Sequence, residues 1–495
     1  MTLDALLPLA VVLTSLLPGI AIFWLAERDT RLRTTLNLSA AIAKLALVVV
    51  IGRGVLAGEI FETRLPFVPG ADLVLRADSL SLLFVSLSAV LWLVTTVYAV
   101  GYLEGSPHRS RFFGFFSISV ASTMGVALAG NLLTFFVFYE TLTLSTYPLV
   151  VHRGTPEAVR AGDLYLRYTL SGGVLLLTGT AILYAAAGSI EFTAGGVLGE
   201  LAGQRGLLIA AFALLIAGLG VKAALIPLHT WLPVAMVAPA PVSALLHAVA
   251  VVKAGAFGIT RVIYDVYGIR LADRLGVTSV LAVVAAATIL YGSLKALAQD
   301  DLKRRLAYST VSQVSFIVLG VTVVGKLLTI GGIAHLVHQG LMKITLFFCA
   351  GNLAEELGIH GVRELRGAGR RMPLTMIAFT LASLGMIGIP PLAGFVTKWY
   401  LGAGAVEVGS SWVIAVLIAS SLLNAAYLLP IVRDAWFGEP SAPWPARKGR
   451  FEVGLWLLLP TIVTAAASVG VGLFAATKLS PLAMAALIAE REIHP

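Results

Sequence analysis

Charged side chains interrupt several apolar stretches of this sequence. Glu140 lies in LLTFFVFYETLTLSTYPLV, Lys222 in IAGLGVKAALIPLHTWLP and Lys253 in PVSALLHAVAVVKAGAFGITRV. A charge in the core of a bilayer costs about 3 kcal/mol or more, so it is retained where it faces the protein interior and serves an ion path or a pair. Burial weakens proton binding by a lysine and a nearby carboxylate strengthens it. We therefore expect Glu140 and Lys222 to form a pair that binds and releases a proton.

The neighbourhood of Glu140 leaves a second interpretation open. On a helix, Glu140, Thr143 and Tyr147 share one face. The carboxylate would then be structural, held by a lysine or a hydroxyl. Because ionisable residues within membrane helices are functional by default, we favour a place for Glu140 on an ion path.

Histidines accompany the other buried lysines. His247 precedes Lys253 by six residues, which places the two about 120° apart on a straight helix, as successive stations rather than one site. His247 could equally be a hydrogen-bonded core residue. His335 and His338 share a helix face with Lys343 near its edge, and histidine exchanges protons near neutral pH. A metal site is the alternative for these two histidines, but no carboxylate or cysteine accompanies them, so we expect no metal.

Two of the charged stretches contain helix breakers. Pro227 follows Lys222 by five residues, and Gly388, Pro390 and Pro391 precede Lys398. The segments GLGVKAALIPLHTW and SLGMIGIPPLAGF are also alike. Paired interrupted helices in the two halves of a chain indicate a transporter built from inverted repeats.

The elements that must position these residues are membrane-spanning helices. Of the 495 residues, 58% are hydrophobic and 12% are charged, and the mean hydropathy is +0.92. Apolar runs of about 18 or more residues recur from Leu3 to Leu473, and each is long enough to cross a bilayer. The pattern predicts fourteen spans, at 3–25, 35–57, 79–102, 111–129, 132–151, 164–187, 206–232, 241–265, 276–297, 305–325, 328–353, 372–401, 411–432 and 451–476.

The net charge of +9 follows the same topology. Twenty lysines and arginines fall in the loops on one side of the predicted membrane, nine fall on the other, and six lie within spans. Basic loops face the cytoplasm, so both termini are expected on the outer side of a cell (inner or plasma) membrane. Of the six buried residues, Lys44 and Arg261 are expected to be snorkelling or interface residues.

The remaining features exclude several classes of protein. The single cysteine, Cys349, excludes a disulfide framework and a cysteine-ligated iron–sulfur cluster in this chain. No nucleotide-binding or metalloprotease motif occurs. We therefore expect no cofactor, no nucleic-acid partner and no redox or hydrolytic chemistry in the chain itself. The segment from Glu59 to Asp78 alternates as a short hairpin would, and the tail from Lys478 to Pro495 is expected to be an interfacial amphipathic segment.

Five motifs, in one order, resemble the antiporter-like proton channel family. They are FYETLTLSTYPLV (138–150), PLHTWLPVAMVAPAPVSALLHAVAVVKAG (227–255), DLKRRLAYSTVSQ (301–313), HLVHQGLMKITLFFCAG (335–351) and GIPPLAGFVTKW (388–399). The family includes the A and D subunits of Mrp-type cation/proton antiporters, the L, M and N subunits of respiratory complex I, and membrane subunits of energy-converting hydrogenases.

The resemblance implies an all-α polytopic fold of about fourteen helices with two inverted five-helix repeats, helices 4–8 and 9–13, in which helices 7 and 12 are broken. The corresponding regions are 1–110, 111–268, 276–437 and 438–495. It also implies that Glu140, Lys222 and Lys253 match the glutamate and lysines of spans 5, 7 and 8. His335 and His338 match the central histidine region, and Lys398 the terminal charge of span 12. The full predicted proton pathway comprises Glu140, Lys222, His247, Lys253, His335, His338, Lys343 and Lys398.

Departures from the family pattern favour one subfamily. Lys398 stands where the M subunit of complex I usually has glutamate, and Val234 replaces the aspartate of the HTWLPDA motif in the L and M subunits. The resemblance therefore favours a protein like the D subunit of an Mrp-type Na⁺(K⁺)/H⁺ antiporter, with other membrane subunits as partners. The alternative is a proton-pumping subunit of an NADH-quinone oxidoreductase or an energy-converting hydrogenase.

Overall fold

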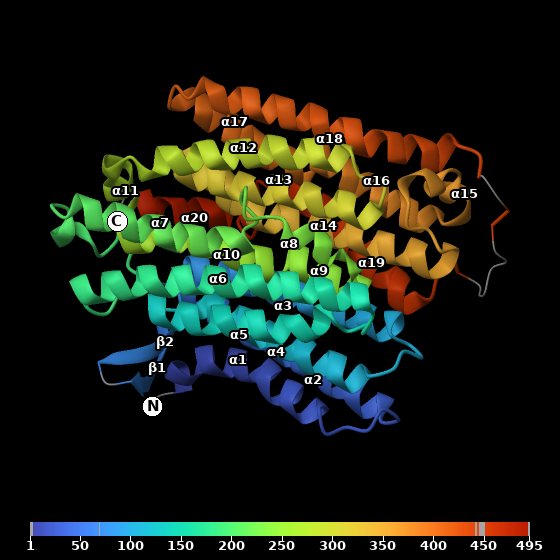
Figure 1. Cartoon of the computed structure of the whole chain (residues 1–495), viewed down its shortest axis with the longest axis horizontal. Helices are drawn as coiled ribbons and strands as arrows, with labels where there is room; N and C mark the ends of the chain where they lie inside the picture. Colours follow the sequence, from blue (N-terminus) through green and yellow to red (C-terminus); the bar gives the residue numbers. More distant parts are fainter. Residues whose placement is uncertain (1–2, 69, 441–442, 445–450, 494–495) are drawn as a thin grey trace.

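The computed structural model describes residues 3–68, 70–440, 443–444 and 451–493. The described chain is almost entirely helical, with most long helices running parallel to the longest axis of the molecule (Figure 1). The elements are, in order, α1 (Leu3–Ile22), α2 (Thr30–Leu56), β1 (Phe61–Val68), β2 (Ala71–Ala77), α3 (Ser79–Tyr102), α4 (Arg109–Leu128), α5 (Leu132–Val150), α6 (Pro156–Ala187), η1 (Gly199–Leu201), α7 (Arg205–Lys222), α8 (Trp231–Val234), η2 (Ala235–Val237), α9 (Ala240–Ala248), α10 (Val251–Arg261), the π-helix η3 (Val262–Tyr267), α11 (Ile269–Leu275), α12 (Val277–Leu297), α13 (Leu302–Thr322), α14 (Lys326–Leu357), η4 (Val362–Leu365), α15 (Ala368–Arg371), α16 (Pro373–Ile387), α17 (Ala393–Glu407), α18 (Ser411–Phe437), α19 (Leu455–Leu473) and α20 (Pro481–Ile493).

Eleven helices of the described chain are long and apolar enough to cross a membrane. They are Ala5–Ile22, Thr30–Leu56, Ser79–Tyr102, Arg109–Leu128, Pro156–Ala187, Arg205–Lys222, Ala240–Tyr267, Val277–Leu297, Lys326–Leu357, Ser411–Phe437 and Leu455–Leu473. The chain is thus a multi-pass membrane protein. The predicted spans at 132–151 and 305–325 correspond to α5 and α13, and the span at 372–401 to α16 followed by α17.

Polar side chains fix where several helices begin. The Asp78 carboxylate accepts the backbone N–H of Ser81 at 2.7 Å and caps α3, and the Asn131 side chain accepts that of Thr134 at 2.8 Å and caps α5. Each cap satisfies one of the N–H groups that a helix leaves free at its first turn. These caps fix the start of α3, directly after Asp78, and of α5, which carries Glu140.

Helix α14 forms the centre of the bundle. It packs against α13, α17, α9, α19, α20, α16 and α3, and its apolar window is completely buried. In Figure 1 the N-terminal helices α1 and α2 lie along one edge of the molecule and α17 and α18 along the opposite edge. A row of residues that crosses the bundle must therefore pass α14.

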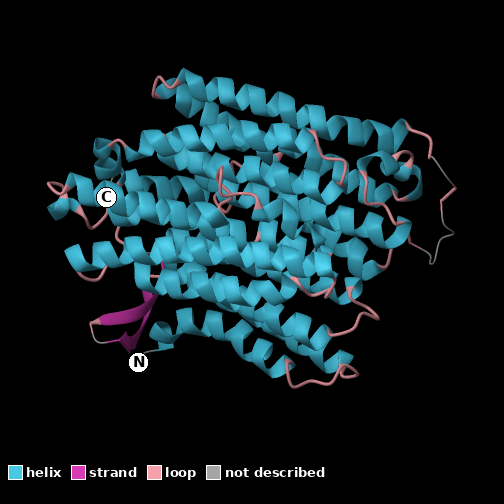
Figure 2. Ribbon diagram, viewed as in Figure 1, coloured by secondary structure: helices cyan, strands magenta, loops and turns pink. Residues whose placement is uncertain are grey.

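The predicted hairpin is confirmed at one end of the bundle. Strands β1 and β2 pair antiparallel, from Phe61 with Ala77 to Val68 with Ala71, and are the magenta arrows of Figure 2. Arg64 and Arg76 each form ion pairs with Glu62 and Glu191, which joins the hairpin to the segment after α6.

The prediction for the C-terminal tail is wrong in the part that the structure describes. Helix α20 packs against α14 and α3 and buries Leu482, Ala485, Ile488, Ala489 and Glu492, so it is a packed element rather than an interfacial one. The tail residues 494–495 lie outside the described residues. Helix α20 therefore adds to the buried core around α14, at the end of the bundle where the hairpin lies.

A candidate proton pathway across the bundle

The site begins at the broken helix that follows α7. Lys222 is the last residue of α7 and is completely buried. Its Nζ donates a short hydrogen bond to the backbone carbonyl of Tyr139 on α5 and lies 3.3 Å from the centroid of that tyrosine ring. The Trp231 indole N–H donates to the carbonyl of Val221 at 2.8 Å, which satisfies one carbonyl that the break sets free. The break predicted near Pro227 is therefore present.

Glu140 lies close to this lysine without contacting it directly. Glu140 is half-buried on α5, and its Oε1 has no hydrogen-bond partner in the described part of the chain. A Cβ added at Gly173 of α6 would lie 2.6 Å from that oxygen, so the glycine leaves the space that the carboxylate occupies. Glu140 is the charged group that acts electrostatically on Lys222. The direct contact of Lys222 on α5 is thus with Tyr139, the chain neighbour of Glu140, and a Glu140–Lys222 pair that exchanges a proton stays a prediction.

The second station lies on α10. Lys253 is completely buried, and its Nζ donates to the carbonyl of Leu336 on α14 at 2.8 Å. Gly255, two residues later, lies against the end of α7, because an added Cβ would come within 2.2 Å of the Ala223 nitrogen. Helix α10 therefore bridges α7 and α14.

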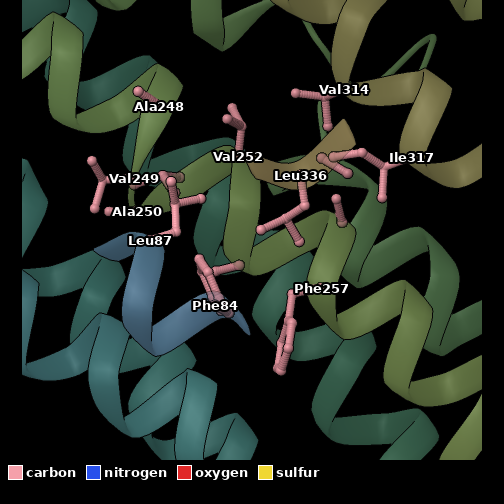
Figure 3. Close-up of a cluster of buried hydrophobic side chains, with 14 of the residues drawn as sticks. Phe84, Leu87, Ala248, Val249, Ala250, Val252, Phe257, Val314, Ile317 and Leu336 are labelled. Atoms are coloured by element: carbon pink, nitrogen blue, oxygen red, sulfur yellow. The ribbon is translucent and has the colours of Figure 1, made fainter. Parts of the chain in front are cut away.

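Apolar side chains of α3, α9, α10, α13 and α14 form a buried cluster, shown in Figure 3, that includes Val252, the chain neighbour of Lys253, and Leu336, whose carbonyl binds Lys253. The labelled residues there are Phe84, Leu87, Ala248, Val249, Ala250, Val252, Phe257, Val314, Ile317 and Leu336. A cation in such surroundings has few groups to compensate lost hydration, so it is retained at a high cost in free energy.

The eighth predicted span, 241–265, matches the candidate span Ala240–Tyr267, but its helix is interrupted between His247 and Lys253. Helix α9 ends at Ala248 and α10 begins at Val251, with Ala250 at φ −106° and ψ −82°. The straight-helix angle between the two residues therefore does not apply. His247 stacks on Phe347 of α14, with ring centroids 4.5 Å apart, and its Nε2 lies 3.3 Å from the sulfur of Met236.

Helix α14 carries the predicted central histidines. His335 and His338 are buried, and neither ring nitrogen of His335 has a hydrogen-bond partner among the described residues. His338 Nδ1 lies 2.9 Å from the hydroxyl of Thr397 on α17. Lys343 Nζ donates to the carbonyl of Leu306 at 3.1 Å and, by a short bond, to the Ser309 hydroxyl of α13.

Two buried amides lie on α13 and α14; the helix pattern places Gln339 on the face of His335 and His338, whereas nothing in the sequence indicated Gln313. Gln339 on α14 and Gln313 on α13 are buried, and their side-chain nitrogen and oxygen atoms lack partners in the described chain. Buried amides without partners have the capacity to hold water, which a proton relay between histidines needs.

The last station occupies the second broken helix. Lys398 of α17 donates to the carbonyl of Ile387 at 2.6 Å, to that of Met386 at 3.3 Å and to the Ser421 hydroxyl at 2.8 Å. These are the carbonyls at the C-terminal end of α16, where a helix carries partial negative charge. Gly388 adopts φ +97°, which favours glycine, and a Cβ there would lie 2.8 Å from Lys398 Cδ.

The structure places the eight predicted residues in three groups. Glu140 and Lys222 form the first; Lys253, His335 and His338 meet around α14; and Thr397 joins His338 to Lys398, its chain neighbour. His247 and Lys343 form no hydrogen bond with the second group in the described part of the chain, but Lys343 acts electrostatically on His247. Together they cross the bundle from α5 to α17, which lies at its far edge in Figure 1.

Lys44 and Arg261 are not snorkelling or interface residues, which corrects that prediction. Lys44 is completely buried, donates a short hydrogen bond to Ser15 and lies 4.2 Å from the ring centroid of Trp92. Arg261 is 1% exposed and forms ion pairs with Asp78 and Asp265. The i, i+4 spacing of Arg261 and Asp265 was the sequence signal for that pair.

Comparisons with known proteins agree with this arrangement. Residues 129–424 match the family described as "NADH:quinone oxidoreductase/Mrp antiporter, TM", and residues 70–113 match "NADH-Ubiquinone oxidoreductase (complex I), chain 5 N-terminus". The chain is 36% identical to the N subunit of the NADH-quinone oxidoreductase of Desulforudis audaxviator, over 95% of this chain and 96% of that one. It is 30% identical to the D subunit of the Na(+)/H(+) antiporter of Bacillus subtilis, over 74% of each.

A solved structure shares the fold. A chain of the Mrp complex from Dietzia sp. DQ12-45-1b superposes with a TM-score of 0.87 and 25% identity, covering 100% of this chain and 98% of that one. Several further curated relatives are longer proteins, and the chain spans 44% to 62% of their length. These relatives are subunits of multi-subunit membrane complexes. The chain therefore belongs to the NADH:quinone oxidoreductase/Mrp antiporter family of proton-translocating, antiporter-like membrane subunits.

Proposed function

We propose that protons move through this chain along the row of buried residues from α5 to α17. The observation that carries the proposal is that each of three stations contacts the chain neighbour of another. Lys222 contacts Tyr139, beside Glu140; Lys253 contacts Leu336, beside His335; and His338 contacts Thr397, beside Lys398. A structural charge needs one partner. A row of cations that each bind a backbone carbonyl, with unpartnered histidines between them, suits repeated proton transfer.

The chemistry of each step follows from burial. A buried lysine keeps its proton while an anion or a carbonyl compensates the charge, and releases it when that partner moves away. Glu140, which has no hydrogen bond on Oε1, is the group that can move toward or away from Lys222. The electrostatic action of Lys253 on His335 and on Lys343 then couples the stations of the central group to one another.

The finer architecture and the location belong to the same proposal. Of the fourteen spans, helices 4–8 (residues 111–268) and 9–13 (residues 276–437) form two inverted five-helix repeats, and both termini lie on the outer side of the cell membrane. The matching breaks after Lys222 and after Ile387 support this symmetry, since each lies beside a lysine that binds backbone carbonyls.

We further propose that the parent complex is an Mrp-type Na⁺(K⁺)/H⁺ antiporter in which this chain takes the place of the D subunit. The near-complete coverage of the Mrp chain and Lys398 at the end of the row support this assignment. A second candidate is a pump of a redox complex that resembles its N subunit, which the longer, 36% identical match favours. In either complex the chain moves ions, and in the redox complex the electron transfer belongs to other subunits.

The first test removes the coupled pair in the intact complex. We expect Glu140→Gln and Lys222→Met to abolish proton movement in inverted membrane vesicles, measured with a pH-sensitive dye, while the complex assembles normally. Lys44→Met is the matched control, because Lys44 is equally buried but binds Ser15 away from the row. Transport at the wild-type rate in both pair variants would contradict the proposed path.

The second test separates the two parent complexes. In vesicles that carry the wild-type complex, an antiporter exchanges protons when Na⁺ or K⁺ is added without any electron donor. A redox pump acidifies the lumen only when its electron donor and quinone are supplied. Proton movement that requires electron transfer would overturn the assignment to an antiporter and favour the redox pump.

A further inference from the structure

A buried cluster of five charged residues lies at the end of the bundle where the hairpin is. The Arg261 guanidinium binds Asp78 at 2.7 Å and Asp265 at 2.9 Å. Arg491 of α20 reaches the same two carboxylates at 3.2 and 3.4 Å, and its Nε lies 3.6 Å from Glu492 Oε1. The cluster thus joins three parts of the chain that are far apart in sequence.

The charges of this cluster do not balance. Three carboxylates (Asp78, Asp265 and Glu492) face two guanidiniums, so the fully ionised cluster carries one excess negative charge. The side chains of Asp265 and Glu492 are completely buried and that of Arg261 is 1% exposed. Removing an uncompensated charge from water is costly, and binding one proton removes it.

Glu492 is the carboxylate that the protein stabilises least as an anion. Asp78 accepts the Ser81 N–H and two hydrogen bonds from Arg261, and Asp265 accepts from both arginines. Neither oxygen of Glu492 has a hydrogen-bond partner among the described residues, and the Asp265 charge faces it. Charge balance and hydrogen bonding therefore both assign the proton to Glu492.

The electrostatics of Glu492 agree with this assignment. Glu492 lies in α20, outside the eleven candidate spans. Burial, and then the charge of Asp265, raise the pKa of Glu492 to about 8, while Arg491 and Arg261 oppose the shift. Asp78 adds to the upward shift, and Tyr264 of η3 is a further titratable group near Glu492 in the described part of the chain; Lys326 of α14 pairs with Glu490 instead.

The cluster lies at the outer end of the two helices that carry the central stations. Arg261 follows Lys253 on α10 by eight residues, a rise of about 12 Å. Tyr264 binds the Thr329 hydroxyl of α14 at 2.7 Å, six residues before His335. The chain at Asp265 is a π-helix, a local form that often marks functional sites.

We propose that Glu492, set against Asp265 and the two arginines, is a proton-binding site at the outer mouth of the proton path. The site takes up one proton without a cofactor or a co-reactant, and holds it between the outer water and the α14 histidines. The inference rests on the proposed function for the direction in which the proton moves on, but the binding of a proton to Glu492 is a separate property.

Proton binding is tested first, in the purified complex without transport. Infrared difference spectra between about pH 10 and about pH 6 report the C=O stretch of a carboxyl group as it becomes protonated. We expect a band that titrates near pH 8, is present in the wild type and in Glu490→Gln, and is lost in Glu492→Gln. Glu490 is the control because it lies on the same helix but pairs with Lys326 at the surface. An identical band in Glu492→Gln would overturn the proposal.

A second variant tests the same proposal in case Glu492→Gln does not fold or assemble. Asp265→Asn leaves two carboxylates and two guanidiniums, so the excess charge is gone. We expect the Glu492 band to move to lower pH by about one unit or more in that variant. A band that does not move would contradict the charge argument, even if Glu492→Gln fails to assemble.

Measurements of proton transport then test whether Glu492 lies on the proton path. We expect Glu492→Gln to slow proton movement at least about ten-fold relative to Glu490→Gln, as loss of a proton-transfer group does elsewhere. If the band is lost but transport is unchanged at every pH, Glu492 is not at the mouth. If the band is present but Glu140→Gln transports normally, the proposed path fails while the binding site remains.

Discussion

Replacement of Gly255 by alanine tests how closely α10 must lie against the broken end of α7. A Cβ at Gly255 would lie 2.2 Å from the Ala223 nitrogen and 2.8 Å from both the Leu219 oxygen and the Lys222 carbonyl carbon. All three are backbone atoms, so no side chain can turn away. Restoring ordinary contact at 3.4 Å requires the helices to separate by about 1.2 Å.

That separation has a predictable energy and a predictable effect on transport. Overpacking of this kind costs about 1–3 kcal/mol of the free energy of unfolding. It also moves Lys253 away from Lys222, and a displacement of about 1 Å can cost reactions that depend on hydrogen-bond distance about a hundred-fold. We therefore expect Gly255→Ala to be less stable and at least about ten-fold slower in proton transport.

The experiment measures both the free energy of unfolding and the rate of proton transport, and it includes a second glycine-to-alanine variant as a control. Unfolding in mixed micelles, followed by tryptophan fluorescence, gives the free energy; the dye assay in vesicles gives the proton rate. Gly402→Ala on α17 is the control, because its nearest neighbour, Leu417 Cδ1, would lie 3.8 Å from the new Cβ. We expect that variant to gain about 0.5–1 kcal/mol. If Gly255→Ala matched Gly402→Ala in both measurements, the close approach of α10 to α7 would be refuted.

Three further variants test other contacts. Arg261→Met leaves its two carboxylate partners buried without their main counter-charge, so we expect a loss of about 3–5 kcal/mol in the free energy of unfolding; an unchanged value would contradict the buried ion pairs. Thr397→Val removes the hydroxyl beside His338 at nearly constant volume, and we expect slower transport with stability lowered by about 1 kcal/mol, measured as above. Burial, then Arg111, lower the pKa of His152, outside the spans, to about 4. Stability from its neutral ring is therefore present above about pH 6.5 and lost as pH falls toward 4, and His152→Gln should show a smaller loss in acid.

Much of the candidate site could be predicted because its signals are chemical. A glutamate or lysine in an apolar run is conspicuous, and the prolines beside Lys222 and Lys398 mark the broken helices directly. The charges therefore located the row without any knowledge of how the helices pack. Which of them function in transport stays a prediction.

Other features depend on contacts that the sequence does not encode locally. The break after Ala248 falls in a run of alanines and valines with no proline or glycine, and it is packed against α14, where a Cβ at Gly340 would lie 3.1 Å from the Ala248 oxygen. Likewise, the role of Arg261 depends on Asp78, which is distant in sequence, and on the position of α20. These are tertiary effects, so the sequence pattern alone predicted an uninterrupted span and a snorkelling or interface arginine.

The burial of α14 has a consequence for how the protein is made. Its most apolar window has a mean hydropathy of only 1.3 and is fully buried, whereas that of α12 has 2.0 and is 56% buried. Leaving two histidines, a glutamine and a lysine in lipid would be costly, since one charged residue alone costs about 3 kcal/mol at the helix centre. Helix α14 is therefore poorly suited to insert into the membrane by itself. It must leave the insertion machinery together with neighbours such as α13. The order in which the helices are synthesised and the order in which they enter the membrane therefore differ for α14.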